Sequence, residues 1–528
     1  MALLRNLYPR AFGSRPSLSE ATIKKARISF FKAAGKNFIF LQVLFLGLFC
    51  YIFGSLFRQA GHIHNLKIVF VDYDGGEIGE AVRAAYSSLH GPNFPTLVEQ
   101  TPSQLPSSRD IFHEVCDITY WGAIYITQGA STRLRDALTS PSPYNASDTI
   151  TYIWNEARYA AVVDATISLP IQQLSNAARI AYTRSLAPTT APLNLTLLAN
   201  PWSLQSHDIQ PTPQGSRAIY NTIVLILILI QEFFYLATVN GLFSQFRLYT
   251  RIPARRIILV RAATSLAYTL CGSLCVAGAI WAFRAGWAVG AGQFALTWMA
   301  LWLFAHVNFL TLDVFTVWLP HPFVPMALVA WIIVNVTSVM LPLELSAGFY
   351  RVGYAIPAHA VFNTMLDVWS RGCNPTLRYS LPTLFAWEVV AFALSALGVL
   401  RRCHCAMLGE ERQAREFKER VDAAVAFELA REAKERERHQ EGKSEEKGTG
   451  LEGSASNETE TARGEDEEDI REELAEVMER LTTRQRREQQ EDTVSFGPAF
   501  ALPFGRPASG DDEERHSGQG VGTGENAA

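Results

Sequence analysis

Four ionisable side chains stand well inside stretches that are otherwise apolar, and they are the first candidates for chemistry: Glu232, His306, Asp313 and Glu388, whereas Glu344 lies near the outer end of its stretch. An ionisable group in hydrocarbon costs roughly 2.5–3.5 kcal/mol on insertion scales, so each one calls for a use. His306 and Asp313 are seven residues apart, which places them on nearly the same helix face. One interpretation is a proton or substrate path lined by all four. The other is hydrogen bonding between helices that fixes their packing.

Six apolar stretches would position these side chains. A helix needs about 20 mostly apolar residues to cross a hydrocarbon layer of about 30 Å. The stretch 37–57 has this length without a charge, and no small-residue cleavage site follows it, which favours an uncleaved signal anchor over a signal peptide. The sequence therefore predicts an α-helical polytopic membrane protein with six transmembrane helices, one plus five. The later five are 219–243, 262–283, 295–317, 324–345 and 382–400.

Basic residues predict the orientation of these helices, because Lys and Arg concentrate in short cytoplasmic segments. They cluster before the first stretch (24–36), after the second (247–261) and after the sixth (401–402). With six spans, all three clusters fall on one side. We therefore expect both termini in the cytoplasm and residues 58–217 on the exoplasmic side.

The region 58–217 has the pattern of a small α/β domain. Repeated strand-then-helix order favours a compact mixed domain over a loose loop. Lys67–Val71 and Tyr120–Thr127 are β-branched or aromatic runs that predict strands. Each precedes a helical pattern, and 151–186 reads as a helix pair broken near Pro170. The two shorter helices are expected at 78–87 and 131–138.

Two N-glycosylation triplets, at Asn145 and Asn194, lie in this exoplasmic region. Such triplets are meaningful only outside the cytoplasm, so they agree with the predicted orientation, although each alone is common by chance. Two further triplets, at Asn335 within a span and Asn457 in the tail, should be unused.

Cysteine and aspartate add two more candidate pairs. Cys116 and Cys373 are the cysteines expected on the oxidising side, and counting alone makes them a candidate disulfide. Asp72 and Asp74 follow the first strand. They fit either a metal-binding or catalytic carboxylate pair or ordinary turn chemistry, and the latter is favoured because Asp and Gly are typical turn residues.

The last quarter of the chain differs sharply in charge. Positions 401–528 hold 20 Lys and Arg against 32 Asp and Glu, a net charge of −12, which leaves +8 for positions 1–400. We expect a cytoplasmic tail that is helical over 410–441 and otherwise disordered, with a short coiled-coil pattern at 470–481. Cys403 and Cys405 fit palmitoylation or are idle reduced thiols. Nucleic-acid binding does not suit an acidic tail.

A family resemblance rests on three segments and on the one-plus-five arrangement. They are KIVFVDYDGGEIG (67–79), YWGAIYIT with the helix after it (120–138), and LPLELSAGFYRVGYAIPAH (341–359). Over about residues 32–402 the chain resembles the fungal nitrosoguanidine-resistance family of membrane proteins, which is defined by a domain of unknown function. That family is similar to type-2 ABC exporter permeases and to phage-infection proteins.

The resemblance implies export of, or resistance to, toxic small molecules, or an influence on lipid distribution. An ABC exporter needs a nucleotide-binding domain, and the chain has no G-x-x-x-x-G-K-[ST] motif. A separate ATPase or another energy source is then required. The alternative function is a non-transporting scaffold or regulator that recruits partners through its tail.

These inferences divide the chain into a cytoplasmic segment (1–36), a first helix (37–57), an exoplasmic domain (58–217), a membrane domain (218–402) and a tail (403–528). We expect no enzyme activity, no cofactor and no metal, because no nucleophile, base or ligand cluster is visible. Expected partners are membrane lipids, hydrophobic small molecules as substrates, and a second copy or cytoplasmic partner at the tail. The plasma membrane is the expected location, with other secretory-pathway membranes as alternatives.

Overall fold

The computed structural model describes residues 21–140, 142–186, 194–212, 223–284, 287–320 and 323–444. The coiled-coil pattern at 470–481 and the triplet at Asn457 lie outside these residues. The chain divides into two compact units. The first comprises 1–229, 270–307 and 325–389, and the second comprises 230–269, 308–324 and 390–528.

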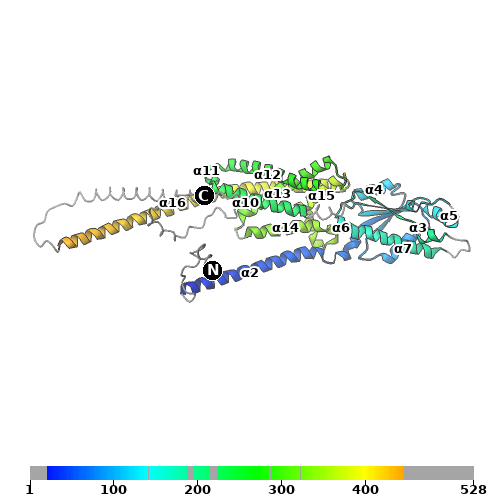
Figure 1. The fold of residues 1–528 in the computed structure, drawn as a ribbon, viewed down its shortest axis with the longest axis horizontal. Coiled ribbons are helices and arrows are strands. Elements are labelled where there is room, and N and C mark those ends of the chain that lie inside the picture. The colour runs from blue at the N-terminus through cyan, green and yellow to red at the C-terminus, as the bar shows by residue number, and fades with distance from the viewer. Residues whose placement is uncertain are drawn as a thin grey trace, which may run out of the picture. The chain divides into compact units, whose positions relative to one another are not determined.

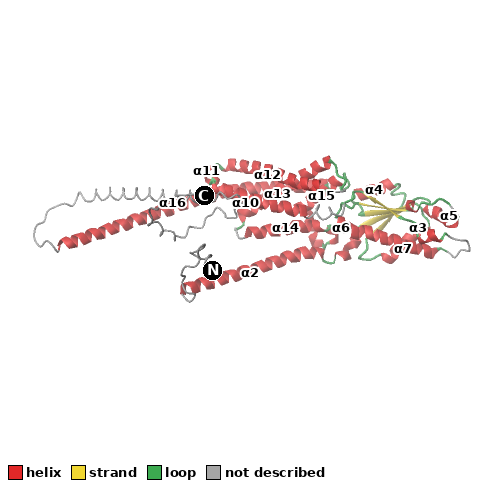
Figure 2. Ribbon diagram, in the orientation of Figure 1, coloured by secondary structure: helices red, strands yellow, loops and turns green. Residues whose placement is uncertain are grey.

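A five-stranded sheet organises the N-terminal part of the first unit (Figure 2). The order is β2-β1-β3-β4-β5, with β4 antiparallel to β3 and the other neighbours parallel. We call the region from β1 to β5 the sheet domain. Its strands are β1 (Lys67–Asp72), β2 (Thr96–Gln100), β3 (Gly122–Ile126), β4 (Ile150–Trp154) and β5 (Leu204–Asp208).

Helices cover both faces of this sheet, because alternate residues of a strand point to opposite sides. From β1, Ile68 and Phe70 pack toward α3 and α7, whereas Val69 and Val71 pack toward α4. Figure 1 shows α4 on one side of the strands and α3 and α7 on the other. The helices of the sheet domain are α3 (Glu77–Leu89), α4 (Ser108–Cys116), α5 (Ala130–Thr139), α6 (Ala160–Val163), α7 (Leu169–Ser185) and α8 (Leu195–Ala199).

The strand-then-helix prediction is confirmed twice, by β1 with α3 and by β3 with α5. The prediction of a helix pair over 151–186 is wrong in its first part, because Ile150–Trp154 is strand β4. The segment ITYIW carries the β-branched and aromatic residues typical of strands. The predicted break near Pro170 is also wrong, because residues 160–185 form one uninterrupted helical run in which a π-helical turn, Asp164–Ser168, directly precedes α7.

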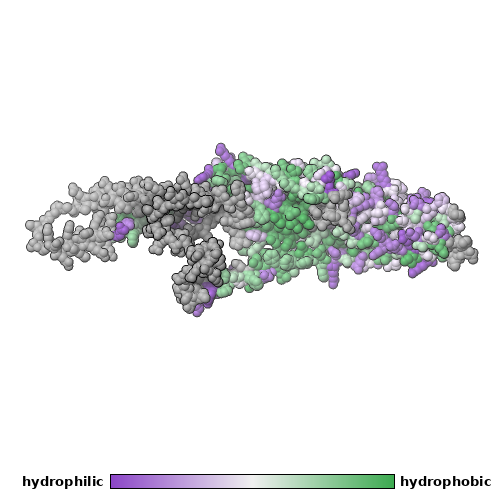
Figure 3. Space-filling view, in the orientation of Figure 1, coloured by the Kyte–Doolittle hydropathy of each residue, from purple (hydrophilic) through white to green (hydrophobic). Residues whose placement is uncertain are grey.

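Long apolar helices follow and precede the sheet domain. Among the described residues, five helices are long and apolar enough to cross a membrane. Figure 3 shows apolar residues gathered over α10, α13 and α14, whereas the surface over α3, α5 and α7 is largely polar. The chain is therefore a multi-pass membrane protein. The five helices are α2 (Ala21–Leu56), α10 (Val224–Gln245), α12 (Ala254–Ala282), α13 (Ala291–Trp318) and α16 (Leu377–Ser444). The candidate span of α2 is Phe30–Leu56, and that of α16 lies within Leu377–Arg431, whose later part is charged.

The fifth predicted span corresponds to α14 (Val324–Met340), which has 17 residues and is shorter than the others. The prediction extended it to residue 345. The helix ends earlier because Pro342 disfavours helical backbone in the residue before it and has no amide hydrogen to donate. A short 3-10 segment, η7 (Leu343–Leu345), follows.

The polar stretch 346–382 contains η8 (Gly348–Ala355) and α15 (Pro357–Trp369). Most residues of α15 are buried. Phe362 and Met365 belong to an apolar core of the first unit that also includes Leu225 of α10 and Phe304 of α13. Helix α15 is thus packed inside the protein, whereas most of η8 is exposed.

Helix α16 extends from Leu377 to Ser444 without a break. The sixth predicted span and the helix predicted for the tail are therefore parts of one helix. The shorter elements of the chain are η2 (Gln59–Asn65), η3 (Ala146–Asp148), the π-helical η4 (Asp164–Ser168) and α11 (Leu248–Arg251).

Candidate functional site: buried charges in the apolar helices

Asp313 lies at the centre of an ion-pair network in the second unit. Its side chain is fully buried on α13. Oδ1 accepts hydrogen bonds from Arg261 Nη2 of α12 at 2.8 Å and from Arg402 Nη2 of α16 at 2.9 Å. Oδ2 accepts a hydrogen bond from Ser395 Oγ at 2.5 Å. One carboxylate therefore joins three helices.

The two arginines have further partners in the same unit. Arg261 Nη1 donates to the Tyr249 hydroxyl at 3.2 Å, and Arg402 Nη2 donates to Thr316 Oγ1 at 2.7 Å. Helices α13 and α16 approach closely here, since a Cβ built on Gly398 would lie 2.8 Å from a methyl of Val317. The network therefore holds α12, α13 and α16 together.

His306 and Glu388 form a second pair, in the first unit. His306 Nδ1 lies 2.5 Å from Glu388 Oε1. The side chain of His306 is 4% exposed and that of Glu388 is 20% exposed. Glu388 Oε2 is buried and has no hydrogen-bond partner among the described residues. The pair therefore has one oxygen that could accept a proton or a polar ligand group.

Glu232 is a further carboxyl group within the apolar helices. It is 0% exposed on α10, and neither carboxyl oxygen has a hydrogen-bond partner in the described part of the chain. Tyr235, one turn along the helix, lies within electrostatic range of both Glu232 and Arg261. The ring of Tyr235 stacks on Tyr268. An unpaired buried carboxyl next to aromatic rings is unusual, because burying such a group without a partner is costly.

The structure thus separates the four predicted site residues by their partners. His306 is paired with Glu388, Asp313 is held by arginines, and Glu232 has no hydrogen-bond partner among the described residues. Sequence reasoning missed Arg261 and Arg402 as partners, because it used them only as markers of the cytoplasmic side. The sequence did contain a signal: each of these arginines borders a predicted span, and a neighbouring span carries a carboxylate.

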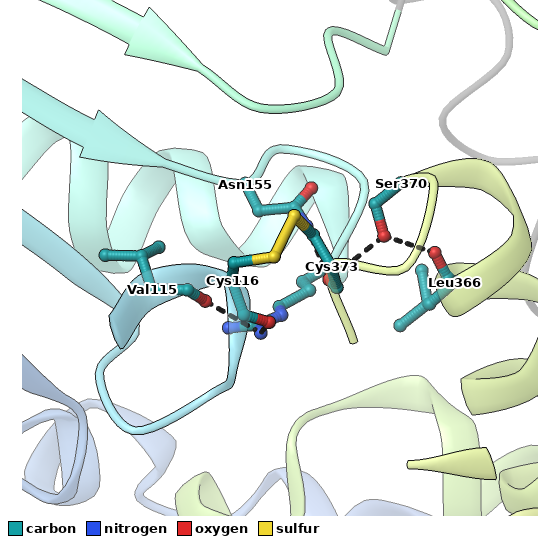
Figure 4. The surroundings of a disulfide bond; sticks show 7 residues. Val115, Cys116, Asn155, Leu366, Ser370 and Cys373 are labelled. Atoms are coloured by element: carbon teal, nitrogen blue, oxygen red, sulfur yellow. Dashed lines mark hydrogen bonds between the residues drawn. A yellow bond between two sulfur atoms is a disulfide. The ribbon is translucent and has the colours of Figure 1, made fainter. Parts of the chain in front are cut away.

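The cysteine pair lies in the first unit. Cys116, at the end of α4, is joined to Cys373 by a disulfide, 257 positions along the chain (Figure 4). Asn155 Nδ2 and Ser370 Oγ both donate to the Cys373 carbonyl, at 3.3 and 3.0 Å. The disulfide ties the sheet domain to the segment after α15.

A buried arginine stands beside this disulfide. Arg158 is 2% exposed, and its Nη2 donates to the carbonyl of Val115 at 3.0 Å. Burial lowers the pKa of Arg158 to about 10, and the Glu344 carboxylate acts in the opposite direction. Nε and Nη1 of Arg158 have no hydrogen-bond partner among the described residues.

The carboxyl groups of Asp208 and Glu156 lie close together at the edge of the sheet. Asp208, at the end of β5, accepts hydrogen bonds from the backbone amides of Glu156 and Gln210 at 3.0 and 3.2 Å. Its carboxyl also hydrogen-bonds that of Glu156. Burial first, and then the neighbouring Glu156, raise the pKa of Asp208 to about 7.

The remaining candidates are the asparagines of the glycosylation triplets and the two cysteines after the sixth predicted span. Asn145 and Asn194 are exposed, each capping a short helix, whereas Asn335 is fully buried in α14. Cys403 and Cys405 lie half-buried in α16.

Asp72 and Asp74 are engaged in turn contacts. Asp72 Oδ1 accepts from the amides of Asp74 and Gly75, the latter with φ of 62°, and Asp74 Oδ2 accepts from the amide of Ser131. These are the contacts of a tight turn followed by a helix. No group of three or more His, Cys, Asp or Glu suited to a metal occurs in the residues that the structure describes.

Comparison with known proteins agrees with a membrane location. The chain is 20% identical over 376 residues to the uncharacterized endoplasmic reticulum membrane protein YJR015W of Saccharomyces cerevisiae, covering 61% of this chain and 71% of the relative. The family model described as "Protein of unknown function (DUF3533)" matches residues 37–393. Since this match spans more than half of the chain, from the first apolar helix into α16, the protein belongs to the DUF3533 family of unknown function.

Proposed function

We propose that this protein is a permease-like exporter of the nitrosoguanidine-resistance type. It would move toxic, hydrophobic small molecules outward across a membrane, with an effect on lipid distribution as a related activity. The plasma membrane is the proposed location, although the yeast relative is named for the endoplasmic reticulum.

The observation that carries this proposal is Glu232. A carboxyl that is fully buried in an apolar helix, with no partner for either oxygen among the described residues, can exchange a proton or receive a polar group of a cargo. The Glu388 Oε2 atom beside His306 is a second such acceptor. Asp313 does not fit the path, because its two arginines and Ser395 already occupy its oxygens.

Reconstituted vesicles test the proposal. The full-length protein is placed in liposomes with a fluorescent hydrophobic compound, with and without a proton gradient or ATP. We expect gradient-dependent movement that is lost in Glu232→Gln. Glu344→Gln, which changes a carboxyl outside the long apolar helices, is the matched control and should retain activity. Absence of movement under every condition with folded wild-type protein would refute transport.

The proposed orientation places the sheet domain on the exoplasmic side and both termini in the cytoplasm. It is supported by the positions of the basic clusters and by the exposed asparagines of the two glycosylation triplets. Glycosidase treatment of the protein expressed in a eukaryotic cell should increase its gel mobility. The shift should disappear in Asn145→Gln/Asn194→Gln and persist in Asn335→Gln.

A second candidate function is a scaffold or regulator. It is favoured by the continuity of α16, which joins an apolar span to a charged segment within one helix. Removal of residues 445–528 distinguishes the two functions. A transporter retains compound movement in vesicles after this truncation, whereas a scaffold loses its cytoplasmic partners in a pull-down and shows no movement in either form.

A further inference from the structure

The second half of α16 carries a narrow apolar stripe. Its four residues recur at intervals of four, which places them along one side of the helix. We call Phe417, Val421, Val425 and Leu429 the α16 stripe. Val421 is 5% exposed and Val425 is 2% exposed, whereas the other two are half-buried. Phe427, on the opposite side of the same helix, is 68% exposed.

The rest of the described chain does not explain this burial. One helix cannot cover its own apolar stripe, because the stripe faces outward from the helix axis. None of the apolar clusters formed by the described residues includes Val421 or Val425. A bilayer does not cover them either, since seven of the ten residues in 411–420 are charged. The burial therefore calls for a further apolar segment.

The tail contains one segment that matches the α16 stripe. In 470–481, Ile470, Leu474, Val477 and Leu481 recur at intervals of four and three, the spacing of an apolar helix face. At about 1.5 Å per residue, this face and the α16 stripe are each about 17–18 Å long. Twelve residues alone are too short for a stable helix in water, so the segment gains stability by packing.

A second apolar run of the tail, 494–504, fits less well. It contains Pro498 and Pro503, which disfavour a helix because proline has no amide hydrogen to donate and its ring clashes with the preceding turn. The segment 470–481 is therefore the better match to the stripe.

The connection between the two elements also has a suitable length. Helix α16 ends at Ser444, and the 25 residues 445–469 precede Ile470. To pair antiparallel with the stripe, this connector must return from Ser444 to the level of Leu429, about 22 Å along the helix axis. Its Gly, Ser, Thr and Glu composition is typical of flexible linkers, for which a connector of this length spans about 25–30 Å. A parallel arrangement would need a return of about 40 Å to Phe417, so the antiparallel one is favoured.

We propose that residues 470–481 form a helix that docks antiparallel on the α16 stripe of the same chain. The contact removes two apolar faces from water, and the short connector makes it an intramolecular event. The inference goes beyond the proposed export function, because this contact does not require transport. It also bears on the scaffold function, since a partner that binds through the α16 stripe would have to displace the tail segment.

Photo-crosslinking tests the proposal. In the full-length protein, Phe417 is replaced by p-benzoylphenylalanine, which keeps the aromatic ring and adds a photoreactive ketone. The matched control carries the same replacement at Phe427. We expect position 417 to crosslink to the peptide that contains Leu481, because antiparallel packing places that end of the segment beside it. Position 427 should give about tenfold less, because its side chain points away from the stripe.

Variants of the tail identify the contact. Leu474→Asp places a charge in the apolar contact and should reduce the crosslink from position 417 about tenfold. Ala475→Asp adds the same charge at the next position, about 130° around the expected helix from its apolar face, and should leave the crosslink unchanged. Circular dichroism and elution volume confirm that each variant is folded.

Three results would overturn the inference. Crosslinks from position 417 to 494–504, or to another segment of the chain, would identify a different occupant. Crosslinks between isotope-labelled and unlabelled chains in a mixed sample would show that a second copy covers the stripe. Equal crosslinking from positions 417 and 427 would mean that no segment is docked on the stripe.

Discussion

Asp313 and Glu232 show two ways in which one protein treats a buried carboxyl. Both residues are 0% exposed in apolar helices of the second unit. Asp313 accepts hydrogen bonds from two arginines and a serine, whereas Glu232 has no hydrogen-bond partner among the described residues. Depth in an apolar helix therefore does not define a role. The partners do, because a carboxylate held by two cations stabilises helix packing and one without partners remains available.

The largest effect is expected from Asp313→Asn. The change leaves Arg261 and Arg402 buried without their carboxylate, which should lower the free energy of unfolding by about 3–5 kcal/mol. Glu232→Gln, by contrast, removes no hydrogen bond among the described residues and should shift the free energy of unfolding by about 0.5 kcal/mol or less. Thermal unfolding of the purified variants in one detergent measures both. Equal losses would remove the distinction between the two residues.

Single arginine changes should have an intermediate effect. Arg261→Gln or Arg402→Gln leaves Asp313 with one cation, so each should cost about 2–3 kcal/mol. The double variant leaves the buried carboxylate without a cation, so it should cost more than the sum of the two single changes if both arginines act through Asp313. Strict additivity in the same unfolding assay would show that the network does not act as a unit.

A third carboxyl, Asp208, extends the comparison to the sheet domain. Its pKa of about 7 in the folded protein exceeds the ordinary value of 3.8, so the folded state binds the proton more tightly. The resulting stabilisation is complete below pH 4 and is lost as the pH rises through 7. We expect a loss of about 1–2 kcal/mol, allowing for partial exposure of the side chain. Unfolding midpoints between pH 4 and 8 should show it, and Asp208→Asn should flatten the profile.

The smallest effect on stability is expected from Glu388→Gln. The side chain is partly exposed and one of its oxygens has no hydrogen-bond partner among the described residues, so the amide can still accept from His306 at a cost of about 1 kcal/mol or less. In the vesicle assay, however, the change should alter the pH dependence of compound movement. A stability loss as large as that of Asp313→Asn would place Glu388 with the structural carboxylates.

Much of the architecture follows from local pattern. The apolar stretches predicted the long helices, and the β-branched runs at Lys67–Val71 and Tyr120–Thr127 predicted two of the strands. Strand β4 was mistaken for a helix because its five residues are followed directly by an Ala-rich helical pattern. Strand β5 escaped notice because its sequence, LQSHD, is polar and largely exposed at the edge of the sheet.

The contacts within the candidate site, in contrast, do not follow from local sequence pattern. The sequence alone determined which residues would be costly to bury, since hydropathy is a property of a single segment. It also determined the charge contrast between the first 400 residues and the tail. Only the tertiary structure decided that Asp313 has two arginine partners and Glu232 has no hydrogen-bond partner among the described residues. Pairing depends on the rotation and contact of helices that are far apart along the chain, and no local pattern records these.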